Sequence, residues 1–265
     1  LPLSIWEPGK RFYHADKPKE KGGLAYHVIR WVRANFFFPD ARQFFIKPAI
    51  RLIKKRLKEQ PADWLITTGP PHSMHVLGYA LRKTNNIKWL ADFRDPWSKF
   101  FVNYELPMMS FVRNRHKRME KKVVSAADCV ITTSPSLTAI YKQYNPSVVT
   151  ILNGYEKLLD GELAQKFTMT YAGALKSNQH LKVVFSVLKT LSDRDQLFAK
   201  QLRFRLYGAS DFINPPSQLK DQFVAYGYRT KQEIDFVLPQ SHILLLLGND
   251  QPDSQLVIHG KLYAY

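Results

Sequence analysis

The feature that most constrains the fold of this chain is an alternation of short apolar runs with longer segments of helical periodicity. Parallel strands need a crossover of a dozen or more residues, usually a helix, so this alternation predicts parallel sheets flanked by helices. The first block predicts strands at 63–68, 87–91, 128–133 and 147–152, with helices at 41–59, 71–84, 108–126 and 134–144.

The same alternation starts again after the polar stretch 156–166, which we predict to be a linker. The second block predicts strands at 167–173, 202–208, 222–227 and 242–248, with helices at 177–193 and 230–240. A chain of 265 residues is long enough for two domains. The predicted fold class is therefore α/β, with two Rossmann-like domains at residues 1–163 and 164–265.

Two of the predicted helices carry local start signals. Ser134 stands directly before Pro135, an order that favours Ser134 as the N-cap of a helix. Thr230 stands three residues before Glu233, which is the spacing of a capping box.

The chain is strongly basic, with a formal net charge of +17. Such a surface favours anionic partners, namely nucleic acid, anionic lipid headgroups or phosphorylated small molecules, and charge alone does not choose among them. The predicted helix 41–59 is basic and amphipathic, with Ile46, Ile50 and Ile53 at helical spacing. It fits either an anionic membrane surface or a solvated helix face.

The single cysteine, Cys129, leaves no disulfide framework, and this favours a reducing compartment such as the cytoplasm. No apolar run approaches the roughly 20 residues of a membrane-spanning helix. The chain begins "LPLSIWEPGK", without an initiator Met or signal-peptide pattern, and stops at "HGKLYAY". We therefore expect a fragment, incomplete at both ends.

Polar residues gather where the predicted strands end, which is where ligands bind in open parallel sheets. These strand ends read "TTGPPHSMH", "DFRDPW", "TSPS" and "NGYEK" in the first half, and "GALKSN" and "GNDQPDSQ" in the second. We expect these loops to line one rim that faces a cleft between the domains.

Each of these motifs also has a purely structural interpretation. Asp92 and Arg94 would form an internal ion pair, with Asp95 in an Asx turn before Pro96. Gly69 with its two following prolines, and Asn153 with its following glycine, would be simple turns.

Known chemical templates exclude several functions. His72 and His75 are three residues apart and share a helix face, but no third ligand is fixed nearby, so we predict no metal. The chain has no GxGxxG, GxxxxGK[ST], HExxH or GxSxG motif. It has no zinc-finger spacing or RRM signature, so we predict no nucleic-acid partner. A nucleic-acid binder stays only as a third hypothesis, which predicts a steep salt dependence.

Taken together and in order, the motifs resemble a bacterial branch of the retaining family-four glycosyltransferases, which have the GT-B fold. The resemblance covers most of residues 24–265 and rests mainly on "TGPPHSMH" and "ADFRDPW", with weaker matches in "WVRANFFFPDARQFFIKPAI", "VITTSPS", "ILNGYEK", "FTMTYAGAL", "VAYGYRTKQEI", "ILLLLGNDQP" and "IHGKLYAY". It implies transfer of a sugar from a UDP- or GDP-linked donor to a glycan or lipid-linked acceptor, as in cell-surface polysaccharide synthesis. No cofactor is implied.

The resemblance also implies roles for individual residues. Asp92, His75 and His72 would be the catalytic residues, near the transferred sugar or the acceptor, with Asp92 orienting a sugar hydroxyl. The implied acceptor-side residues are Gly69, Arg94, Asp95 and Asn153, and the implied donor-binding residues are Gly173, Ala174, Lys176 and Lys261. A Gly-rich turn and a helix N-terminus suit the donor diphosphate, because backbone N–H groups and the helix dipole favour an anion there.

Two departures from the family pattern raise a second hypothesis. Ala264 stands where the family has a glutamate for the donor ribose, and Gln179 stands where it often has an arginine. Leaving two ribose hydroxyls unpaired costs on the order of 1–3 kcal/mol, or roughly 10- to 100-fold in affinity. The alternative is therefore a non-catalytic or divergent relative that binds a nucleotide or a glycan.

Overall fold

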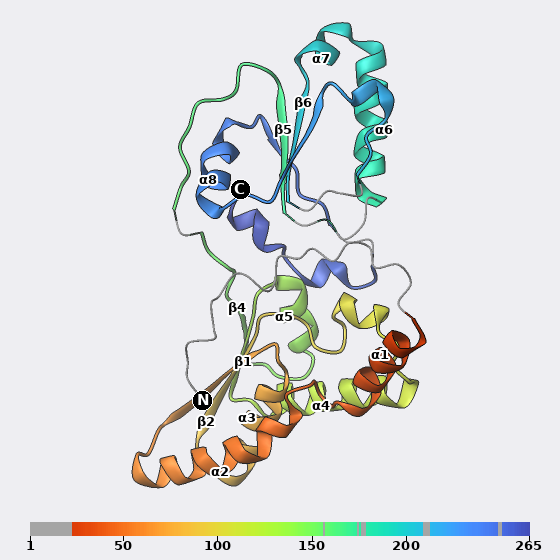
Figure 1. Cartoon of the computed structure of the whole chain (residues 1–265). Coiled ribbons are helices and arrows are strands. Elements are labelled where there is room, and N and C mark those ends of the chain that lie inside the picture. The colour runs from red at the N-terminus through yellow and green to blue at the C-terminus, as the bar shows by residue number, and fades with distance from the viewer. Residues whose placement is uncertain (1–22, 156, 174, 176–178, 209–212, 249–250) are drawn as a thin grey trace, which may run out of the picture. The chain divides into compact units, whose positions relative to one another are not determined.

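The computed structural model in Figure 1 describes residues 23–265, apart from 156, 174, 176–178, 209–212 and 249–250. The chain divides into two compact units. The N-terminal unit comprises Gly22–Gly154 and Asn249–Gly260, and the C-terminal unit comprises Tyr155–Gly248 and Lys261–Tyr265. Each unit holds one parallel four-stranded sheet flanked by helices, as the alternation predicts.

The sheet of the N-terminal unit follows the order of the chain. Its strands are β1 (Trp64–Gly69), β2 (Lys88–Phe93), β3 (Cys129–Thr132) and β4 (Val148–Thr150). Thr67 pairs in register with Ala91, Ala91 with Val130, and Val130 with Val148. These positions belong to the buried face of the sheet, and their β-branched and small side chains suit close contact with helices.

Five helices accompany this sheet in the described residues. They are α1 (Leu24–Phe36), α2 (Gln43–Glu59), α3 (Ser73–Thr84), α4 (Ser110–Ala126) and α5 (Pro135–Tyr141), with the short 3₁₀ turns η2 (Phe101–Glu105) and η5 (Ser254–Leu256). Ser134 caps α5 by accepting a hydrogen bond from the Leu137 amide, so the predicted cap is confirmed. Helix α1 was not predicted from the sequence.

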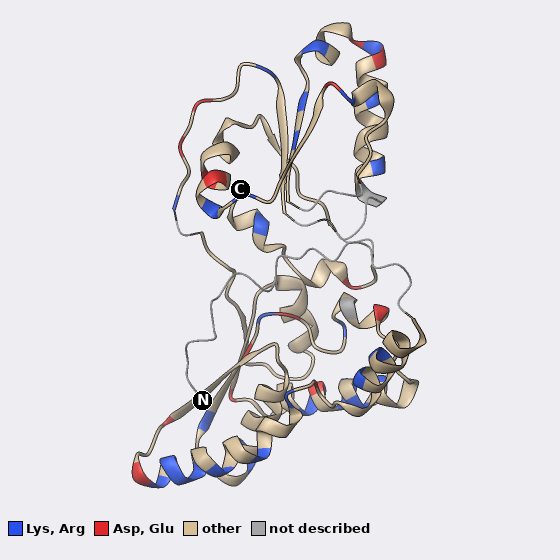
Figure 2. Ribbon diagram, in the orientation of Figure 1, with Lys and Arg blue, Asp and Glu red and all other residues tan. Residues whose placement is uncertain are grey.

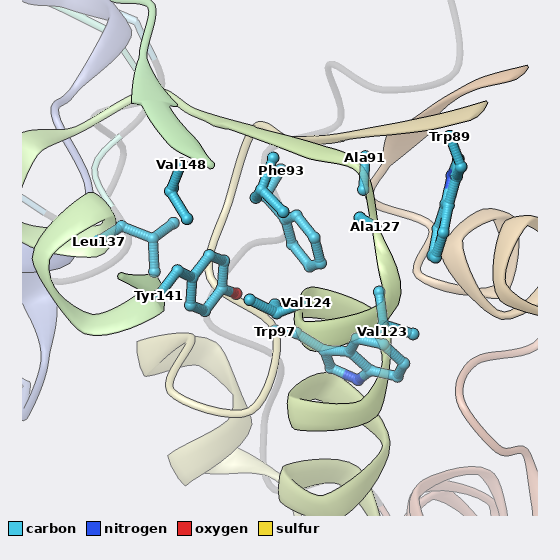
Figure 3. Close-up of a cluster of buried hydrophobic side chains, with 11 residues drawn as sticks. Trp89, Ala91, Phe93, Trp97, Val123, Val124, Ala127, Leu137, Tyr141 and Val148 are labelled. Atoms are coloured by element: carbon cyan, nitrogen blue, oxygen red, sulfur yellow. The ribbon is translucent and has the colours of Figure 1, made fainter. Parts of the chain in front are cut away.

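The core of the N-terminal unit lies between the buried face of the sheet and helices α4 and α5. Figure 3 shows Phe93 and Tyr141 pointing into the same space, and their ring centroids are 5.0 Å apart. Trp89, Val123 and Val124 are fully buried in the same cluster. Truncating such a large buried aromatic side chain to alanine typically costs about 3–5 kcal/mol.

The opposite face of this sheet is more open in the described structure. Burial alternates along β1 and β2, so that Trp64 and Ile66 stand on the face away from Thr67. The side chain of Ile66 is 64% exposed. Parallel sheets usually bury both faces, and this face therefore departs from the general rule.

The sheet of the C-terminal unit has the order β7-β6-β5-β8. Its strands are β5 (Thr168–Ala172), β6 (Arg203–Tyr207), β7 (Phe223–Gly227) and β8 (Ile243–Leu244), and its helices are α6 (Gln179–Arg194), α7 (Gln196–Gln201) and α8 (Lys231–Val237), with 3₁₀ turns η3 (Ser217–Leu219), η4 (Leu238–Gln240) and η6 (Gly260–Tyr263). Figure 1 shows α6 on one side of this sheet and α8 on the other.

Two local features of the C-terminal unit explain its elements. Leu181, Phe185 and Leu188 recur at helical spacing along α6 and pack into a core with β6. The capping box at the start of α8 is confirmed: the Thr230 side chain accepts from the Glu233 amide, and the Glu233 carboxylate accepts from the Thr230 amide.

None of the helices in the described part of the chain combines the length and apolarity needed to cross a lipid bilayer.

Candidate functional site

The candidate site of the N-terminal unit begins where strand β1 leads into helix α3. The predicted helix start at residue 71 lies two residues early, because α3 begins at Ser73. The amide of Ser73 donates a 2.8 Å hydrogen bond to the Asp40 carboxylate. Asp40 therefore satisfies an N-terminal amide of α3 from 33 residues upstream, and no local sequence signal indicated it.

His75 is fully buried and its ring is tied to two strands. Its Nδ1 lies 2.9 Å from the Thr67 hydroxyl, which also accepts a 2.9 Å hydrogen bond from the indole Nε1 of Trp89. The ring of His75 also stacks on Phe93, with centroids 4.1 Å apart. Because the Thr67 oxygen already accepts from Trp89, its proton is directed to Nδ1, and the neutral His75 ring carries its proton on Nε2.

Gly69 makes room for that imidazole. A Cβ atom at Gly69 would lie 2.5 Å from Nε2 of His75, a distance that real side chains do not tolerate. Nε2 of His75, Nδ1 of His72 and Oγ of Ser73 are buried, and none has a hydrogen-bond partner among the described residues. Three unpaired polar atoms at one helix start are unusual, because buried polar groups are normally satisfied.

His72 lies beside His75 and extends the cluster towards α4. Its ring stacks on Trp97, with centroids 4.9 Å apart and planes 5° from parallel. Burial lowers the pKa of His72 to about 4, although the Asp40 carboxylate opposes this shift. Burial also lowers the pKa of His75 well below its usual value. Both imidazoles are therefore neutral at pH 7 and act as hydrogen-bonding groups rather than cations.

Asp92 lies inside strand β2, so the prediction that the strand ends at residue 91 is wrong. The strand continues to Phe93, and Asp92 is paired in register with Thr68 and Ile131. Burial alternates along β2, which places the half-buried Asp92 side chain on the sheet face opposite Phe93 and His75. The structure thus brings His72 and His75 together and leaves Asp92 on the other face of the same strand end.

The loop after β2 is held by backbone bonds and not by the ion pair considered above. Asp92 and Arg94, which are both described, form no ion pair with each other; the Arg94 side chain is exposed. The Arg94 amide donates to the Gly69 carbonyl at 2.9 Å, and the Arg94 carbonyl accepts from the Thr133 hydroxyl at 2.8 Å. Burial raises the pKa of Asp95, and the neighbouring Arg94 opposes that shift.

Glu120, in the middle of α4, is the residue that fixes the next turn of this loop. Its carboxylate accepts hydrogen bonds from the amides of Trp97 and Ser98, both at 3.2 Å, and from the Ser98 hydroxyl. The Tyr141 hydroxyl donates a fourth bond at 2.6 Å. Burial, reinforced by the Glu120 charge, raises the pKa of Tyr141 well above its usual value, so the phenol keeps its proton.

His116 completes the connection one turn earlier on α4. Its Nδ1 accepts a 2.9 Å hydrogen bond from the Trp97 indole, and burial lowers its pKa to about 4. Sequence reasoning missed Asp40, His116 and Glu120. His116 and Glu120 are polar positions of an amphipathic helix, which in sequence look the same as a solvated helix face, and Asp40 lies in the turn before α2.

Asn153 stands three residues beyond the end of β4 and is half-buried. Strand β4, which precedes Asn153, pairs with β3. The hydroxyl of Thr132, the last residue of β3, forms a 2.6 Å hydrogen bond with the Thr138 hydroxyl. Asn153 therefore belongs to the carboxyl edge of the same sheet as the histidines, at the opposite end of the strand order.

In the C-terminal unit, the structure brings together Gly173 and Lys261, two of the four predicted donor residues. Gly173 follows β5 with a φ of 143°, and a Cβ there would lie 2.1 Å from Nζ of Lys261. Nζ donates a 2.6 Å hydrogen bond to the Tyr171 hydroxyl and lies 3.9 Å from the Tyr171 ring centroid. Burial lowers the pKa of Lys261 to about 8. Ala174 and Lys176 lie outside the described residues.

Metal ligands do not assemble in the part of the chain that the structure describes, since no three His, Cys, Asp or Glu side chains gather there. The arrangement offers instead two neutral imidazoles and a set of hydroxyl groups in one unit, and a half-buried cation at a glycine turn in the other.

Comparison with known proteins assigns no family, because no family model and no curated protein matches the chain. Among solved structures, accessory secretory protein 1,2 and 3 of Streptococcus pneumoniae is 9% identical over 78% of this chain and 41% of that one, with a TM-score of 0.48. The Gap123 glycosylation-associated complex of Streptococcus agalactiae is 12% identical over 78% and 43%, with a TM-score of 0.48.

A third solved structure, TarM of S. aureus, is 12% identical over 74% of this chain and 39% of that one, with a TM-score of 0.44. The chain thus spans less than half the length of each of these three structures. Similarity at this level assigns no activity to the chain.

Proposed function

We propose that this chain belongs to a glycosyltransferase that moves a sugar from a nucleotide-sugar donor to a glycan or lipid-linked acceptor with retention. The observation that carries the proposal is the pair Gly173 and Lys261 at the carboxyl end of β5, where parallel sheets bind ligands. Lys261 pairs with no carboxylate among the described residues. A cation whose burial is costly, and which has no counter-ion, favours a bound anion.

In this proposal the donor diphosphate contacts the turn after β5. Only a residue without a Cβ leaves Nζ of Lys261 close to the backbone at Gly173, and the positive φ there also favours glycine. The ammonium would stabilise the negative charge that develops on the leaving diphosphate. Retention needs no strong protein nucleophile when leaving-group stabilisation and acceptor alignment supply the catalysis.

The acceptor and the transferred sugar are assigned to the N-terminal unit. Nε2 of His75 and Nδ1 of His72 are buried and unpaired among the described residues. We therefore assign the two rings to the support of the acceptor surface and not to direct contact with a sugar hydroxyl. Asp92 is the proposed carboxylate for a hydroxyl on the other face of the strand end, and Arg94, Asp95 and Asn153 are proposed to contact the acceptor.

Donor binding tests the proposal directly. Isothermal titration of the full-length protein with UDP- and GDP-sugars is expected to show binding, and Lys261→Met is expected to weaken it by about tenfold or more. The matched control is Lys220→Met, an exposed lysine of the same unit, which should leave the affinity unchanged. No binding at millimolar donor would remove the transferase proposal.

Asp92→Asn separates a catalytic role from a structural one. Transfer should fall at least about tenfold while the free energy of unfolding changes by less than about 0.5 kcal/mol, because Asp92 makes no described ion pair. A collapse of stability would instead show that Asp92 holds the strand end in place.

A second candidate, a divergent relative that binds a nucleotide or glycan without catalysis, is favoured by Ala264. This residue follows η6 directly, is exposed and presents only a methyl group three residues after Lys261. Donor binding without detectable transfer in the full-length protein would select this candidate.

The proposed membrane partner is an anionic lipid surface, and helix α2 is the element assigned to it. Phe44 and Leu52 on α2 are 72% and 67% exposed, and Figure 2 shows Lys and Arg recurring along the same helix. The stripe of Ile46, Ile50 and Ile53 packs against Leu77 and Leu81 of α3, so only the exposed apolar side chains of α2 are left to meet a lipid surface, beside its basic ones. Flotation with vesicles should depend on anionic lipid, and Phe44→Ser should weaken it; flotation indifferent to lipid charge contradicts the assignment.

A further inference from the structure

The segment that follows β2 forms a pair of small hollows against helix α4. They measure about 110 and 170 Å³ and share three lining residues, Ser98, Lys99 and Lys117. Drug-sized ligand sites usually measure about 300–1,000 Å³, so each hollow suits a single small group and not a whole sugar nucleotide.

The smaller hollow, which we name the Lys117 pocket, is lined by hydrogen-bond donors and cations without a carboxylate. Its lining includes Lys99, Arg113 and Lys117, with the polar side chains of Ser98 and Asn103. Lys99 and Lys117 are exposed and Arg113 is half-buried, so the pocket attracts anions as a cluster of like charges at a small hollow.

Arg113 builds the wall of the pocket and does not supply free charge to it. Its guanidinium donates to the carbonyls of Asn103, Leu106 and Met108 at 3.2, 3.0 and 3.3 Å. These three bonds hold the η2 segment against α4. Arg113 is therefore a positioning residue for the pocket.

The two lysines differ in how far they are already engaged. Nζ of Lys99 lies 3.8 Å from the Asp253 carboxylate, which also accepts a 2.6 Å bond from the Tyr104 hydroxyl. Lys117 forms no ion pair among the described residues, so its charge is the one available to a ligand. Figure 2 shows that Lys and Arg recur along α4, which adds to the positive potential.

His116 connects this pocket to the histidines of the candidate site. It lines the pocket, and its Nδ1 is occupied by the Trp97 indole, so the proton of the neutral ring lies on Nε2. The ring of His72 stacks on a face of the same indole. A group bound in the pocket would thus lie one tryptophan ring away from His72.

We propose that the Lys117 pocket binds a phosphate group carried by the acceptor. The identity of the acceptor rests on the proposed function, whereas phosphate binding itself follows from the pocket. The hydroxyls of Ser98 and Tyr104 already donate to Glu120 and Asp253, so the donors left for a ligand include the Lys117 ammonium and one N–H of Asn103. Phosphate suits such a site better than a neutral sugar does, because its charged oxygens accept charge-assisted hydrogen bonds.

The probes are inorganic phosphate and glycerol 3-phosphate. Each is titrated into the isotopically labelled full-length protein at constant ionic strength and without nucleotide sugar, and the change in NMR chemical shifts gives the Kd. Lys117→Gln should raise the Kd by about tenfold. The matched control is Lys122→Gln, an exposed lysine on the same helix outside both hollows, which should change the Kd by less than about twofold. Equal losses in both variants would reveal non-specific attraction and overturn the proposal, as would the absence of any saturable shift near Ser98.

Vesicles containing phosphatidic acid distinguish the source of the phosphate. If the acceptor is lipid-linked, Lys117→Gln should release the protein from these vesicles while Lys122→Gln does not. If only glycerol 3-phosphate binding responds, the phosphate belongs to a soluble or glycan acceptor. Either result supports the phosphate pocket. If Lys117→Gln changes neither vesicle binding nor glycerol 3-phosphate binding, the proposed pocket is wrong. A protein that binds phosphate but no nucleotide sugar would keep the pocket and reject the transferase.

Discussion

The carboxyl edges of the two sheets are built in opposite ways. In the N-terminal unit, His72, Trp97 and Glu120 belong to a buried set whose members stack on or bond to one another. In the C-terminal unit, the corresponding edge presents one half-buried cation, Lys261, held by a single tyrosine hydroxyl and its ring. The first arrangement preserves a geometry, whereas the second leaves a charge that a ligand can satisfy.

This difference predicts different responses to mutation. Changes in the interlocked edge should reduce stability, because buried polar groups lose partners that nothing else replaces. Changes at Lys261 should affect anion binding and leave stability nearly unchanged. Tryptophan fluorescence in a Trp6→Phe background is suited to separating the two. Trp31, Trp64, Trp89 and Trp97 lie in the N-terminal unit, residues 155–265 contain no tryptophan, and the substitution removes the fifth tryptophan of the chain.

The largest effect is expected for Glu120→Ala. The variant leaves two amides, one hydroxyl and one phenol without their shared acceptor, and the N-terminal unit should lose about 3–5 kcal/mol of unfolding free energy. Urea unfolding followed by tryptophan fluorescence measures the loss. Glu105→Ala, at an exposed carboxylate, is the control and should stay within about 0.5 kcal/mol. A loss below about 1 kcal/mol would show that Glu120 does not hold the loop.

Acid should destabilise the N-terminal unit before the residues of the C-terminal unit respond. The pKa values of His72 and His116 are lowered from 6.5 to about 4, so the unfolded chain binds protons more readily between these values. Stability is therefore complete above pH 6.5 and is lost as the pH falls towards 4, by up to about 3 kcal/mol for each histidine. Unfolding midpoints by tryptophan fluorescence at pH 7 and pH 5 test this; equal midpoints would contradict it.

Gly69→Ala should cost the N-terminal unit about 1–3 kcal/mol, because the new methyl group would press on the buried ring of His75. The matched control is Gly154→Ala, where a Cβ would meet nothing within 4 Å and no such loss is expected. If both variants unfold at the same urea concentration as the parent chain, the ring is free to move and the edge is less interlocked than described.

The smallest stability effect is expected for Lys261→Met, within about 1 kcal/mol at pH 7. Because the pKa of Lys261 is lowered from 10.5 to about 8, the unfolded chain binds its proton more tightly, and stability should rise with pH above 8. Lys261→Met should abolish this rise. Urea unfolding between pH 7.5 and 9.5, followed by the near-UV circular dichroism of tyrosine, measures this rise. Tyr171 keeps its proton throughout this range, because burial raises its pKa to about 12. A rise that persists in Lys261→Met would assign it to another group.

Much of the local structure could be predicted from the sequence. The alternation places every strand of both sheets within a few residues of its observed position, and the caps at Ser134 and Thr230 form as their spacing predicts. The apolar run of each strand and the spacing of each cap extend over only a few neighbouring residues, so they can be recognised in the linear sequence. The strand 87–91 was predicted too short because Asp92 is polar, yet its side chain lies on the more open face.

The candidate site was predicted only in part, for a physical reason. The histidines were found because they follow a strand end, and Gly173 and Lys261 were suggested by the family resemblance. The residues that hold the histidine edge together, Asp40, His116 and Glu120, lie far from it in the sequence. Their polar side chains resemble solvent-facing positions until packing brings their partners to them.

The two α/β units, the order of their elements and the strand ends at which polar residues gather all follow from the amino-acid sequence. Packing in three dimensions was needed to show that Asp40 caps α3, that Gly69 leaves room for the His75 ring, and that residues 251–260 belong to the N-terminal unit. Periodicity and capping follow from interactions between near neighbours along the chain. The choice of distant partners follows from shape and hydrogen-bonding complementarity, which exists only once the sheets and helices have packed.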